Sequence, residues 1–333
     1  MTNHLLSQLA HVEILSPRPA ETVAFFEQQL GLEISERSGQ SVYMRGWGEF
    51  FHHSVKVTEA ARPGLGHVGW RAESAEDLVD VAQALAVTGN GLGWIDGDHG
   101  HGPAYRFLSP DEHLNEVFWE VEHWQAPPEL KSTLRDRPQK YTGRGAAARW
   151  LNHVNLSASN VRACREFFQQ HLGFRYRGCA VLDGTDKELI AFLAVGALDH
   201  DIAFTLDPAG AHGRLNHIAF RVDTREDLMR AADILRDYGP GTIEFGPGRH
   251  APGGSFFLYL REPGGNRIEM YTGETLILAP DWQPIHWFAS DNPLAYWGGT
   301  VPQSMYTYAT PPVDMPQSAQ VPSVAGPGSH TAE

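Results

Sequence analysis

The sequence lacks the features that would mark several large classes of protein. Only two of its 333 residues are cysteines, Cys164 and Cys179, which excludes a disulfide framework and favours a reducing cytoplasm. Lysine and arginine total 26 against 40 aspartates and glutamates, a formal net charge of −14, so no basic face is available for nucleic acid. No apolar run approaches the roughly 18 residues of a membrane span, and the first residues do not resemble a signal peptide. These absences predict a cytoplasmic protein that binds neither nucleic acid nor membrane.

What the sequence does contain is 17 histidines and a short motif that recurs four times. Each copy alternates histidine with apolar residues, the pattern of a half-buried strand. The copies are Leu9-Ala-His11-Val, Leu65-Gly-His67-Val, Leu151-Asn-His153-Val and Leu215-Asn-His217-Ile. A repeat of this kind indicates that the chain is built from four similar modules.

A helical pattern follows each motif. The first and third helices are predicted over residues 20–30 and 161–172, each closed by a glycine, Gly31 or Gly173, in the place of a left-handed C-cap. The second and fourth begin at Ser74 and Thr224, each followed three residues later by an acid that favours N-terminal capping. Short β-rich runs with Gly and Pro turns come next, so each module is predicted to be β-α-β-β-β. Alternate modules share a helix signature, which indicates duplication of a two-module domain.

The composition places the domain boundaries. We predict an N-terminal two-module domain over residues 5–124 and a polar linker rich in proline and arginine over 125–148. A catalytic two-module domain is predicted over 149–275, followed by a C-terminal lid over 276–310. Residues 311–333 are rich in Pro, Ser, Gln, Gly and Ala, the composition of a disordered tail.

Three residues of the second domain have the chemistry of an iron site. His153 and His217 occupy equivalent points of neighbouring modules, and Glu269 is an acid within an otherwise apolar strand, where a charge is costly unless it is paired or binds a metal. Two imidazoles and one carboxylate on one face hold Fe(II) in oxygen-activating enzymes and leave positions for substrate and O2. Mn(II) suits the same ligands.

The longest motif is Gly246-Pro-Gly-Arg-His250-Ala-Pro-Gly-Gly-Ser-Phe-Phe-Leu-Tyr259, which continues through Pro263-Gly to Glu269. With these residues the sequence resembles the type I extradiol ring-cleaving dioxygenases of the vicinal oxygen chelate superfamily, which include catechol 2,3-dioxygenases and dihydroxybiphenyl and homoprotocatechuate dioxygenases. The resemblance covers about residues 5–300. It implies an α+β fold of four βαβββ modules in two tandem glyoxalase/bleomycin-resistance-like domains. It also implies Fe(II)-dependent cleavage of a catechol by O2 to a hydroxymuconic-semialdehyde-type product, in a homotetramer or larger assembly.

The resemblance assigns further roles around the triad. His200 matches the acid/base of the family, and its imidazole suits proton transfer near neutrality. His250 and Tyr259 match the residues that hydrogen-bond the bound catecholate. Asn155, on the same face as His153, is a candidate for a hydrogen bond behind the ligands.

Two departures from the family pattern bear on function. Phe245 stands where homoprotocatechuate enzymes carry an arginine that grips a carboxylate, and Phe192 lies in the same pocket region, so a neutral alkyl- or aryl-substituted catechol is predicted. In the first domain the triad-equivalent residues are His11, His67 and Glu116, with His53 in the place of His200 and Arg106 in that of Tyr259. We interpret this set as either a relic or an accessory metal site. His53 is the parallel of His200, with a structural role for His52 and His53 as the alternative.

The superfamily also contains glyoxalase-like isomerases and proteins that bind metal or aromatic compounds without catalysis. Those alternatives remain open, although a binding protein has no need of the three groups around the metal, His200, His250 and Tyr259.

Overall fold

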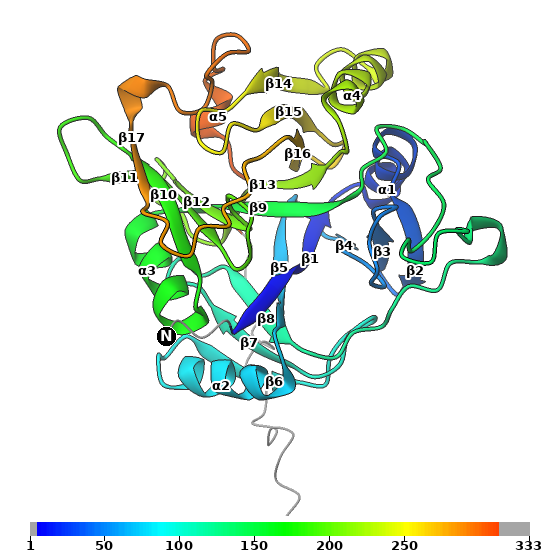
Figure 1. Cartoon of the computed structure of the whole chain (residues 1–333), viewed down its shortest axis with the longest axis horizontal. Helices are drawn as coiled ribbons and strands as arrows, with labels where there is room; N and C mark the ends of the chain where they lie inside the picture. Colours follow the sequence, from blue (N-terminus) through cyan, green and yellow to red (C-terminus); the bar gives the residue numbers. More distant parts are fainter. Residues whose placement is uncertain (1–4, 313–333) are drawn as a thin grey trace, which may run out of the picture.

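The computed structural model describes residues 5–312, which form two large mixed β-sheets flanked by helices (Figure 1). The first sheet has eight strands in the order β2-β3-β4-β1-β5-β8-β7-β6, and the second has nine in the order β14-β15-β16-β13-β9-β12-β11-β10-β17. The strands of the first sheet are β1 (Leu6–Ser16), β2 (Glu33–Ser38), β3 (Ser41–Arg45), β4 (Val55–Glu59), β5 (Gly64–Ala72), β6 (Gly91–Ile95), β7 (Ala104–Leu108) and β8 (Leu114–Phe118). Those of the second are β9 (Trp150–Ala158), β10 (Arg175–Val181), β11 (Glu188–Ala194), β12 (Ile202–Leu206), β13 (Arg214–Arg221), β14 (Ile243–Arg249), β15 (Phe256–Arg261), β16 (Arg267–Thr272) and β17 (Ile285–Phe288).

Each sheet is made of two βαβββ modules, to which the second sheet adds β17 as a ninth strand, and this confirms the predicted fold class. Within a module the first and last strands pair in parallel, as β1 does with β4 and β13 with β16. The two modules of a sheet join through their first strands, β1 with β5 and β9 with β13, which are antiparallel. The histidine motifs lie on these four central strands, so the two histidines of each sheet are brought to adjacent strands.

The helices form where the sequence predicts them. They are α1 (Pro19–Phe25), which continues into the π-helical turn η1 (Phe26–Leu30), α2 (Ala75–Ala86), α3 (Val161–Leu172) and α4 (Arg225–Tyr238). Gly173 closes α3 in the left-handed conformation with φ 72°. Thr224 and Asp227 form a reciprocal capping box at the start of α4. The apolar stripe of α3, which includes Cys164, is buried, as expected of a structural thiol.

The two sheets share one hydrophobic core, because aromatic side chains pack between them. Trp70 of the first sheet meets Phe174 and Phe168 at ring-centroid distances of 4.9 and 6.4 Å. On the other side, Phe26 packs against Phe220 at 6.2 Å. The side chains of Phe26, Trp70, Phe168 and Phe220 are all fully buried. Packing of this extent fixes the position of one sheet relative to the other.

The segment that connects the two sheets contains one 3₁₀ turn, η2 (Pro128–Leu130), and projects as a loop at the right of Figure 1. Its end returns to the core, where the backbone N–H groups of Ala146 and Ala148 donate to the carbonyls of Gln29 and Leu30. Gly31, with φ 82°, is required here, because a Cβ would collide with the carbonyl oxygen of Arg144.

Beyond β16 the chain runs along the edge of the second sheet. Strand β17 pairs in parallel with β10, and two short helical turns follow, η3 (Ala289–Asp291) and α5 (Ser304–Thr307). Backbone hydrogen bonds between Arg249 and residues 296–297 hold this segment against β14. Of the tail predicted over residues 311–333, residues 313–333 lie outside the described part of the chain. Within residues 5–312, no helix has both the length and the apolar character needed to cross a membrane.

Candidate metal centre and active site

The three predicted ligands of the second sheet lie together. His153 comes from β9, His217 from β13 and Glu269 from β16, which are three adjacent strands. Nε2 of His153 is 3.0 Å from Oε2 of Glu269, Nε2 of His217 is 3.1 Å from the same oxygen, and the two Nε2 atoms are 3.3 Å apart. All three side chains are buried. The small side chain of Ala219, in register with both His153 and Glu269, leaves room between the outer strands.

A β-bulge directly precedes each ligating histidine. The pairing of β9 with β13 shifts by one residue at Asn152 and again at Asn216, so each asparagine is the extra residue of a bulge. Both side chains contact the neighbouring histidine, with Oδ1 of Asn152 2.8 Å from Nδ1 of His153 and Oδ1 of Asn216 2.9 Å from Nδ1 of His217.

These contacts determine which ring nitrogen faces the centre. Oδ1 of Asn216 also accepts a hydrogen bond of 2.9 Å from Arg267, so this oxygen is an acceptor and His217 Nδ1–H must donate to it. The amide of Asn152 is oriented in the same sense by its contact with the Glu274 carboxylate at 3.4 Å. Each histidine therefore presents an unprotonated Nε2 to the centre.

The donor set fits a divalent cation. Burial lowers the pKa of His153 to about 3, so the imidazole is neutral. Burial alone would raise the pKa of Glu269, but its contacts with His153 and His217 hold it well below the usual range. Three lone-pair donors facing one another at 3.0–3.3 Å repel unless a cation lies between them. Ligands at right angles around an ion with bonds of about 2.1 Å are about 3.0 Å apart, as in a facial triad.

His200 lies beside the triad. Its ring centroid is 4.1 Å from that of His153, and its Nδ1 is 3.3 Å from Oδ2 of Asp199. Burial opposes the charged imidazole, but the Asp199 carboxylate outweighs that effect and raises the pKa of His200. Asp199 is itself held by a hydrogen bond of 2.8 Å from the Tyr271 hydroxyl. The imidazole is thus fixed in place next to the ligands.

His250 and Tyr259 flank the other side of Glu269. His250 Nδ1–H donates to the carbonyl of Leu294 at 2.6 Å, so its Nε2 accepts from the Tyr259 hydroxyl at 3.1 Å. The same Nε2 is 3.4 Å from Oε1 of Glu269. Burial, and then the Glu269 charge, raise the pKa of Tyr259 well above its usual value, so the phenol keeps its proton.

A cavity of about 300 Å³ opens onto these six residues, at the lower end of the range for small-molecule sites. Its lining includes Phe192 and Asn155, and Asn155 accepts a hydrogen bond of 2.9 Å from Thr205 rather than contacting a metal ligand. Phe245 is not among the lining residues, which corrects its predicted place in the pocket. It stacks behind Tyr259 at 6.3 Å, because β14 and β15 pair Phe245 directly with Tyr259. No lysine or arginine of the described chain lines this cavity.

The triad-equivalent residues of the first sheet also meet. His11, His67 and Glu116 place their ligand atoms within 4.8 Å of one another, and all are buried. Arg106 donates to Oε2 of Glu116 at 3.0 Å, in the register position that Tyr259 holds in the second sheet. The ring of His53 is 4.9 Å from that of His11, as His200 is beside His153.

The sequence did not predict the residues that hydrogen-bond the two histidine ligands, or those that hold His200. A signal for Asn152 and Asn216 was present, because both histidine motifs of the second domain read Leu-Asn-His, whereas the first domain has Ala10 and Gly66 at these points. Asp199 precedes His200 in the sequence, but only the fold brings Tyr271 to it.

Comparison with known proteins agrees with this site. The family model described as "Glyoxalase/Bleomycin resistance protein/Dioxygenase superfamily" matches residues 8–117 and 150–270. Metapyrocatechase from Geobacillus stearothermophilus is 42% identical over 311 residues, covering 92% of this chain and 94% of the relative. Manganese-dependent 2,3-dihydroxybiphenyl 1,2-dioxygenase from Geobacillus genomosp. 3 is 35% identical over 288 residues, covering 85% and 90%.

The fold is also similar to solved structures. Homoprotocatechuate 2,3-dioxygenase from Brevibacterium fuscum, in complex with 3,4-dihydroxyphenylacetate, superposes with a TM-score of 0.82 at 26% identity, covering 93% of this chain and 94% of that one. The 2,3-dioxygenase LapB from Pseudomonas sp. KL28 has a TM-score of 0.78 at 25% identity, covering 86% and 99%. With both of its domains matched, this chain belongs to the Glyoxalase/Bleomycin resistance protein/Dioxygenase superfamily.

Proposed function

We propose that this chain is an extradiol dioxygenase that opens a neutral alkyl- or aryl-substituted catechol with O2, giving a hydroxymuconic-semialdehyde-type product. The observation that carries the proposal is the convergence of His153, His217 and Glu269 on a cavity that His200, His250 and Tyr259 also line. The names of the relatives support the reaction class, since both curated relatives described above are named as enzymes of catechol-type substrates.

The triad is the proposed site of Fe(II), with Mn(II) as the alternative that one relative's name supports. When bound there, the metal supplies a common centre for catechol and O2 and a path for electrons between them. The protein's own contribution is to hold the ligands at fixed tautomers, through Asn152 and Asn216, and to place its proton-transfer groups around the ring.

His200 is the proposed acid/base. Its imidazole lines the cavity beside His153 and is fixed by Asp199, so it can exchange a proton with bound reactants without reorienting. On the opposite side, Tyr259 remains a phenol and donates a hydrogen bond to a substrate oxygen. When the Tyr259 O–H turns from His250 to the substrate, Nε2 of His250, whose ring is anchored through Leu294, is free to accept a catechol proton.

The cavity walls favour a neutral substituent. Apolar side chains surround the ring site, and they include Ile190, Phe192, Leu206, Pro252 and Leu294. Without a lysine or arginine there, a substrate carboxylate loses water and gains no cationic partner. A hydrogen bond to a charged group contributes about 1.5–3 kcal/mol, so kcat/KM for a carboxylated catechol should be about ten- to a hundredfold lower than for a neutral one.

The test is oxygen consumption by protein purified without oxygen and loaded with Fe(II). Catechol, 3-methylcatechol and 2,3-dihydroxybiphenyl should consume O2 and give yellow ring-opened products, 3,4-dihydroxyphenylacetate should be a poor substrate, and His217→Ala should be inactive. A preference for 3,4-dihydroxyphenylacetate refutes the substrate assignment alone. A metal-loaded protein that consumes no O2 with any catechol refutes the dioxygenase, and a binding protein or an isomerase then replaces it.

The domain division is also part of the proposal, with 5–124 and 149–275 as the two-module domains, 125–148 as the linker and 276–310 as the lid.

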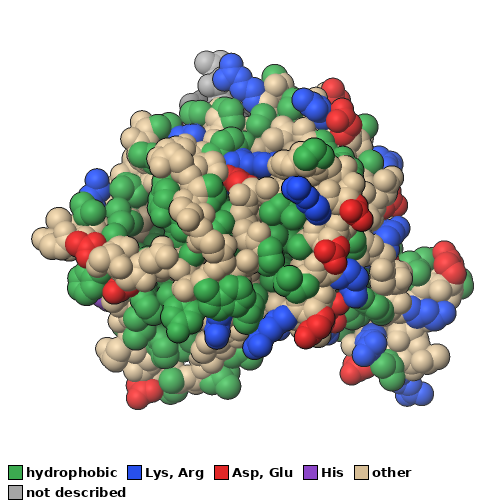
Figure 2. All heavy atoms as spheres, turned by 90° about the horizontal axis from the view of Figure 1, so that it is seen from above, with side chains coloured by type: hydrophobic (Ala, Val, Ile, Leu, Met, Phe, Trp, Pro, Cys, Tyr) green, Lys and Arg blue, Asp and Glu red, His purple; other side chains and the backbone are tan. Residues whose placement is uncertain are grey.

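Exposed apolar side chains support assembly into a homotetramer or larger. Seven of them come from the C-terminal segment: Leu276, Leu278, Ile285, Phe288, Tyr296, Trp297 and Tyr306. Figure 2 views the side of β14, β17 and α5, where hydrophobic side chains spread over one half and charged ones gather toward the linker loop. Light scattering coupled to size exclusion measures the assembly, and a monomer or a dimer refutes it.

A further inference from the structure

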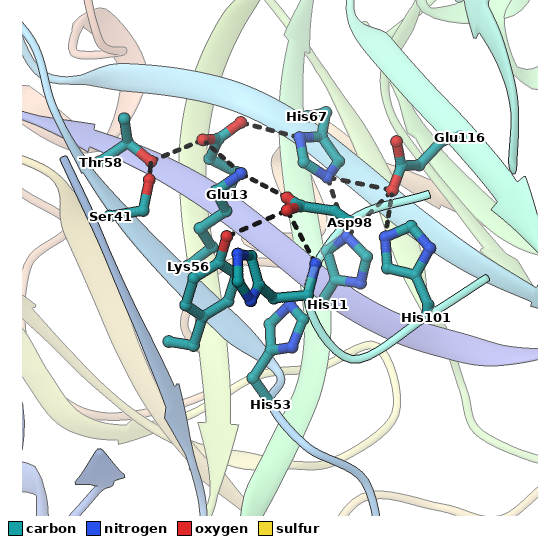
Figure 3. Close-up of polar contacts among 12 residues, drawn as sticks. His11, Glu13, Ser41, His53, Lys56, Thr58, His67, Asp98, His101 and Glu116 are labelled. Atoms are coloured by element: carbon teal, nitrogen blue, oxygen red, sulfur yellow. Dashed lines mark hydrogen bonds and ion pairs between the residues drawn. The ribbon is translucent and has the colours of Figure 1, made fainter. Parts of the chain in front are cut away.

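The first sheet contains a cluster of four buried metal-ligating side chains, one more than the sequence indicates. Besides His11, His67 and Glu116, the imidazole of His101 enters the cluster from the loop between β6 and β7, with Nε2 3.1 Å from Oε1 of Glu116 (Figure 3). Nε2 of His11 and of His67 are 3.4 and 3.3 Å from the same oxygen. The side chain of His101 is 2% exposed, and neither its Nε2 nor Oε1 of Glu116 has a hydrogen-bond partner among the described residues.

Contacts on the outer side of two of these rings orient them toward the centre. His67 Nδ1–H donates to Oε2 of Glu13 at 2.8 Å, and His101 Nδ1–H donates to the carbonyl of Gly102 at 2.9 Å. These contacts direct both Nε2 atoms to the centre. Without a metal, Nε2 of His67 shares a hydrogen bond of 2.8 Å with Nε2 of His11, and a bound cation would replace that proton.

In the first sheet, Glu13 orients the ring of His67 through Nδ1, as Asn216 orients the ring of His217 in the second sheet. The pairing of β1 with β5 shifts at Gly66, directly before His67. A Cβ on Gly66 would collide with the Glu13 carboxylate, so the glycine opens the space in which Glu13 reaches the histidine. Thr58 and Lys56 hold the other oxygen of Glu13 at 2.6 and 3.4 Å. Both sheets therefore orient a histidine through its Nδ1, the first with a carboxylate and the second with an amide. This shared arrangement indicates a metal site in the first sheet and not a loose cluster of histidines.

The position of His101 makes this site differ from the catalytic one. Arg106 faces Glu116 in the register in which Tyr259 faces Glu269. Five residues before Arg106 is His101, whereas five before Tyr259 is Gly254, which has no side chain to offer. The second sheet also brings an imidazole to its carboxylate, but His250 contacts Oε1 of Glu269, whereas His153 and His217 contact Oε2. In the first sheet, His101 contacts the same oxygen as His11 and His67, so its imidazole belongs to the ligand group.

Four donors in a closed arrangement are typical of structural zinc. In a tetrahedron with bonds of about 2.0–2.1 Å the ligand atoms are about 3.3 Å apart, and the three contacts of Glu116 Oε1 are 3.1, 3.3 and 3.4 Å. The Nε2 atoms of His11 and His67 are closer, at 2.8 Å, and His101 lies outside the group of ligand atoms that are all within 4.8 Å of one another. Binding of the ion would therefore separate the first two rings and draw the ring of His101 inward. The second carboxylate oxygen is engaged by Arg106 at 3.0 Å, so Glu116 offers one ligand atom. Three imidazoles and one carboxylate oxygen, with no open position, suit Zn(II).

We propose that the first sheet binds a second, non-catalytic Zn(II) ion through four ligands: His11, His67, His101 and Glu116. The ion joins β1, β5 and β8 to the loop before β7, which otherwise is tied to the sheet at His101 only by isolated bridges. Its role is to stabilise the N-terminal unit. This inference does not depend on the substrate or reaction assigned to the second sheet.

The experiment measures metal content and coordination in the full chain. Chelator-stripped protein is equilibrated with Zn(II) and analysed by plasma mass spectrometry. Wild type should bind two ions per chain, and the double variant His153→Ala/His217→Ala should still bind one. Co(II) in that double variant should give the intense visible bands of a tetrahedral centre. A double variant that binds no metal overturns the proposal, and so does an octahedral Co(II) spectrum.

The fourth ligand is tested by one substitution and a matched control in the double variant. His101→Ala should weaken Zn(II) binding by about 100-fold or more, by comparison with the 10–100-fold effect of outer contacts. His99→Ala removes an imidazole from the same loop whose Nδ1 contacts Glu36 at 2.8 Å, away from the centre, and should bind as the parent does. Equal affinities for the two variants would refute the role of His101. Circular dichroism of each apo protein confirms that the comparison is between folded chains, and the Co(II) spectrum tests the site without altering any of its ligands.

Discussion

Substitution of Asn216 by alanine is the sharpest test of the metal centre, because it leaves every ligand in place. Oδ1 of Asn216 accepts hydrogen bonds from His217 Nδ1–H and from Arg267, each at 2.9 Å. Asn216→Ala leaves the buried N–H of His217 without a partner, which costs about 1–3 kcal/mol. It also frees the ring to rotate or to adopt the other tautomer, with a proton on Nε2, which cannot bind a metal.

Loss of such an outer contact weakens metal binding by about 10–100-fold, which corresponds to about 1.4–2.7 kcal/mol. The assay is competition for Fe(II) or Mn(II) against a chromophoric chelator, under anaerobic conditions. Asn155→Ala is the matched control, since this asparagine lines the same cavity but bonds Thr205 and not a ligand.

Asn216→Ala should therefore lose metal affinity while Asn155→Ala retains it, and excess metal should restore most of the activity of Asn216→Ala. The reasoning is refuted if Asn216→Ala binds metal as tightly as wild type. It is equally refuted if Asn155→Ala loses as much affinity, because the cavity wall and not the bulge contact would then control the metal.

Three further predictions follow from other parts of the structure. His200→Gln should keep its metal content but slow the chemical step by about 10²–10⁴-fold, which is the usual contribution of a positioned acid/base. Single-turnover absorbance measures that step, and an unchanged rate would exclude His200 as the acid/base. Although burial opposes its charge, contact with Arg267 lowers the pKa of Glu244 to about 2, below its unfolded value of 4.5. The stability that this carboxylate contributes is therefore complete above about pH 5.5 and is lost as the pH falls from 4.5 through 2. In denaturant titrations, the difference in free energy of unfolding between wild type and Glu244→Gln should shrink over that range. A difference that stays constant with pH would contradict this reasoning. Phe168→Ala, which empties a fully buried site between Trp70 and the second sheet, should lower the free energy of unfolding by about 3–5 kcal/mol in urea titrations; a change below about 1 kcal/mol would mean that the shared core does not hold the sheets together.

Much of the architecture was accessible from the sequence because its periodic signals are strong. The histidine motifs marked the central strands, and glycine and capping residues marked the ends of helices such as α3 and α4. The ligands could be found because a buried acid such as Glu269 is unusual on an apolar strand.

What escaped sequence reasoning depends on departures from regular geometry. Strict alternation would point Asn216 away from His217, and only the bulge turns it toward the ring. His101 lies in a loop, where no periodicity predicts direction, and so the fourth donor of the first sheet was not seen. Phe245 was misplaced for a related reason, because counting back from His250 does not show that the side chain packs behind Tyr259.

The bulges have a consequence for how this chain tolerates change in length. An extra residue in a strand shifts every later side chain to the opposite face of the sheet unless a bulge absorbs it, so the metal centre depends on the number of residues in β9 and β13 as well as on their identity. Deleting Asn216 would leave regular pairing, because Leu215 and His217 already pair with the consecutive residues Leu156 and Asn155, but His217 would lose its outer contact. Deleting a paired residue of β13 would instead turn the side chains on one side of the deletion to the opposite face. Insertions and deletions in these strands should therefore be far less tolerated than substitutions, whereas the exposed loop at residues 131–138 can vary in length without reaching either metal site.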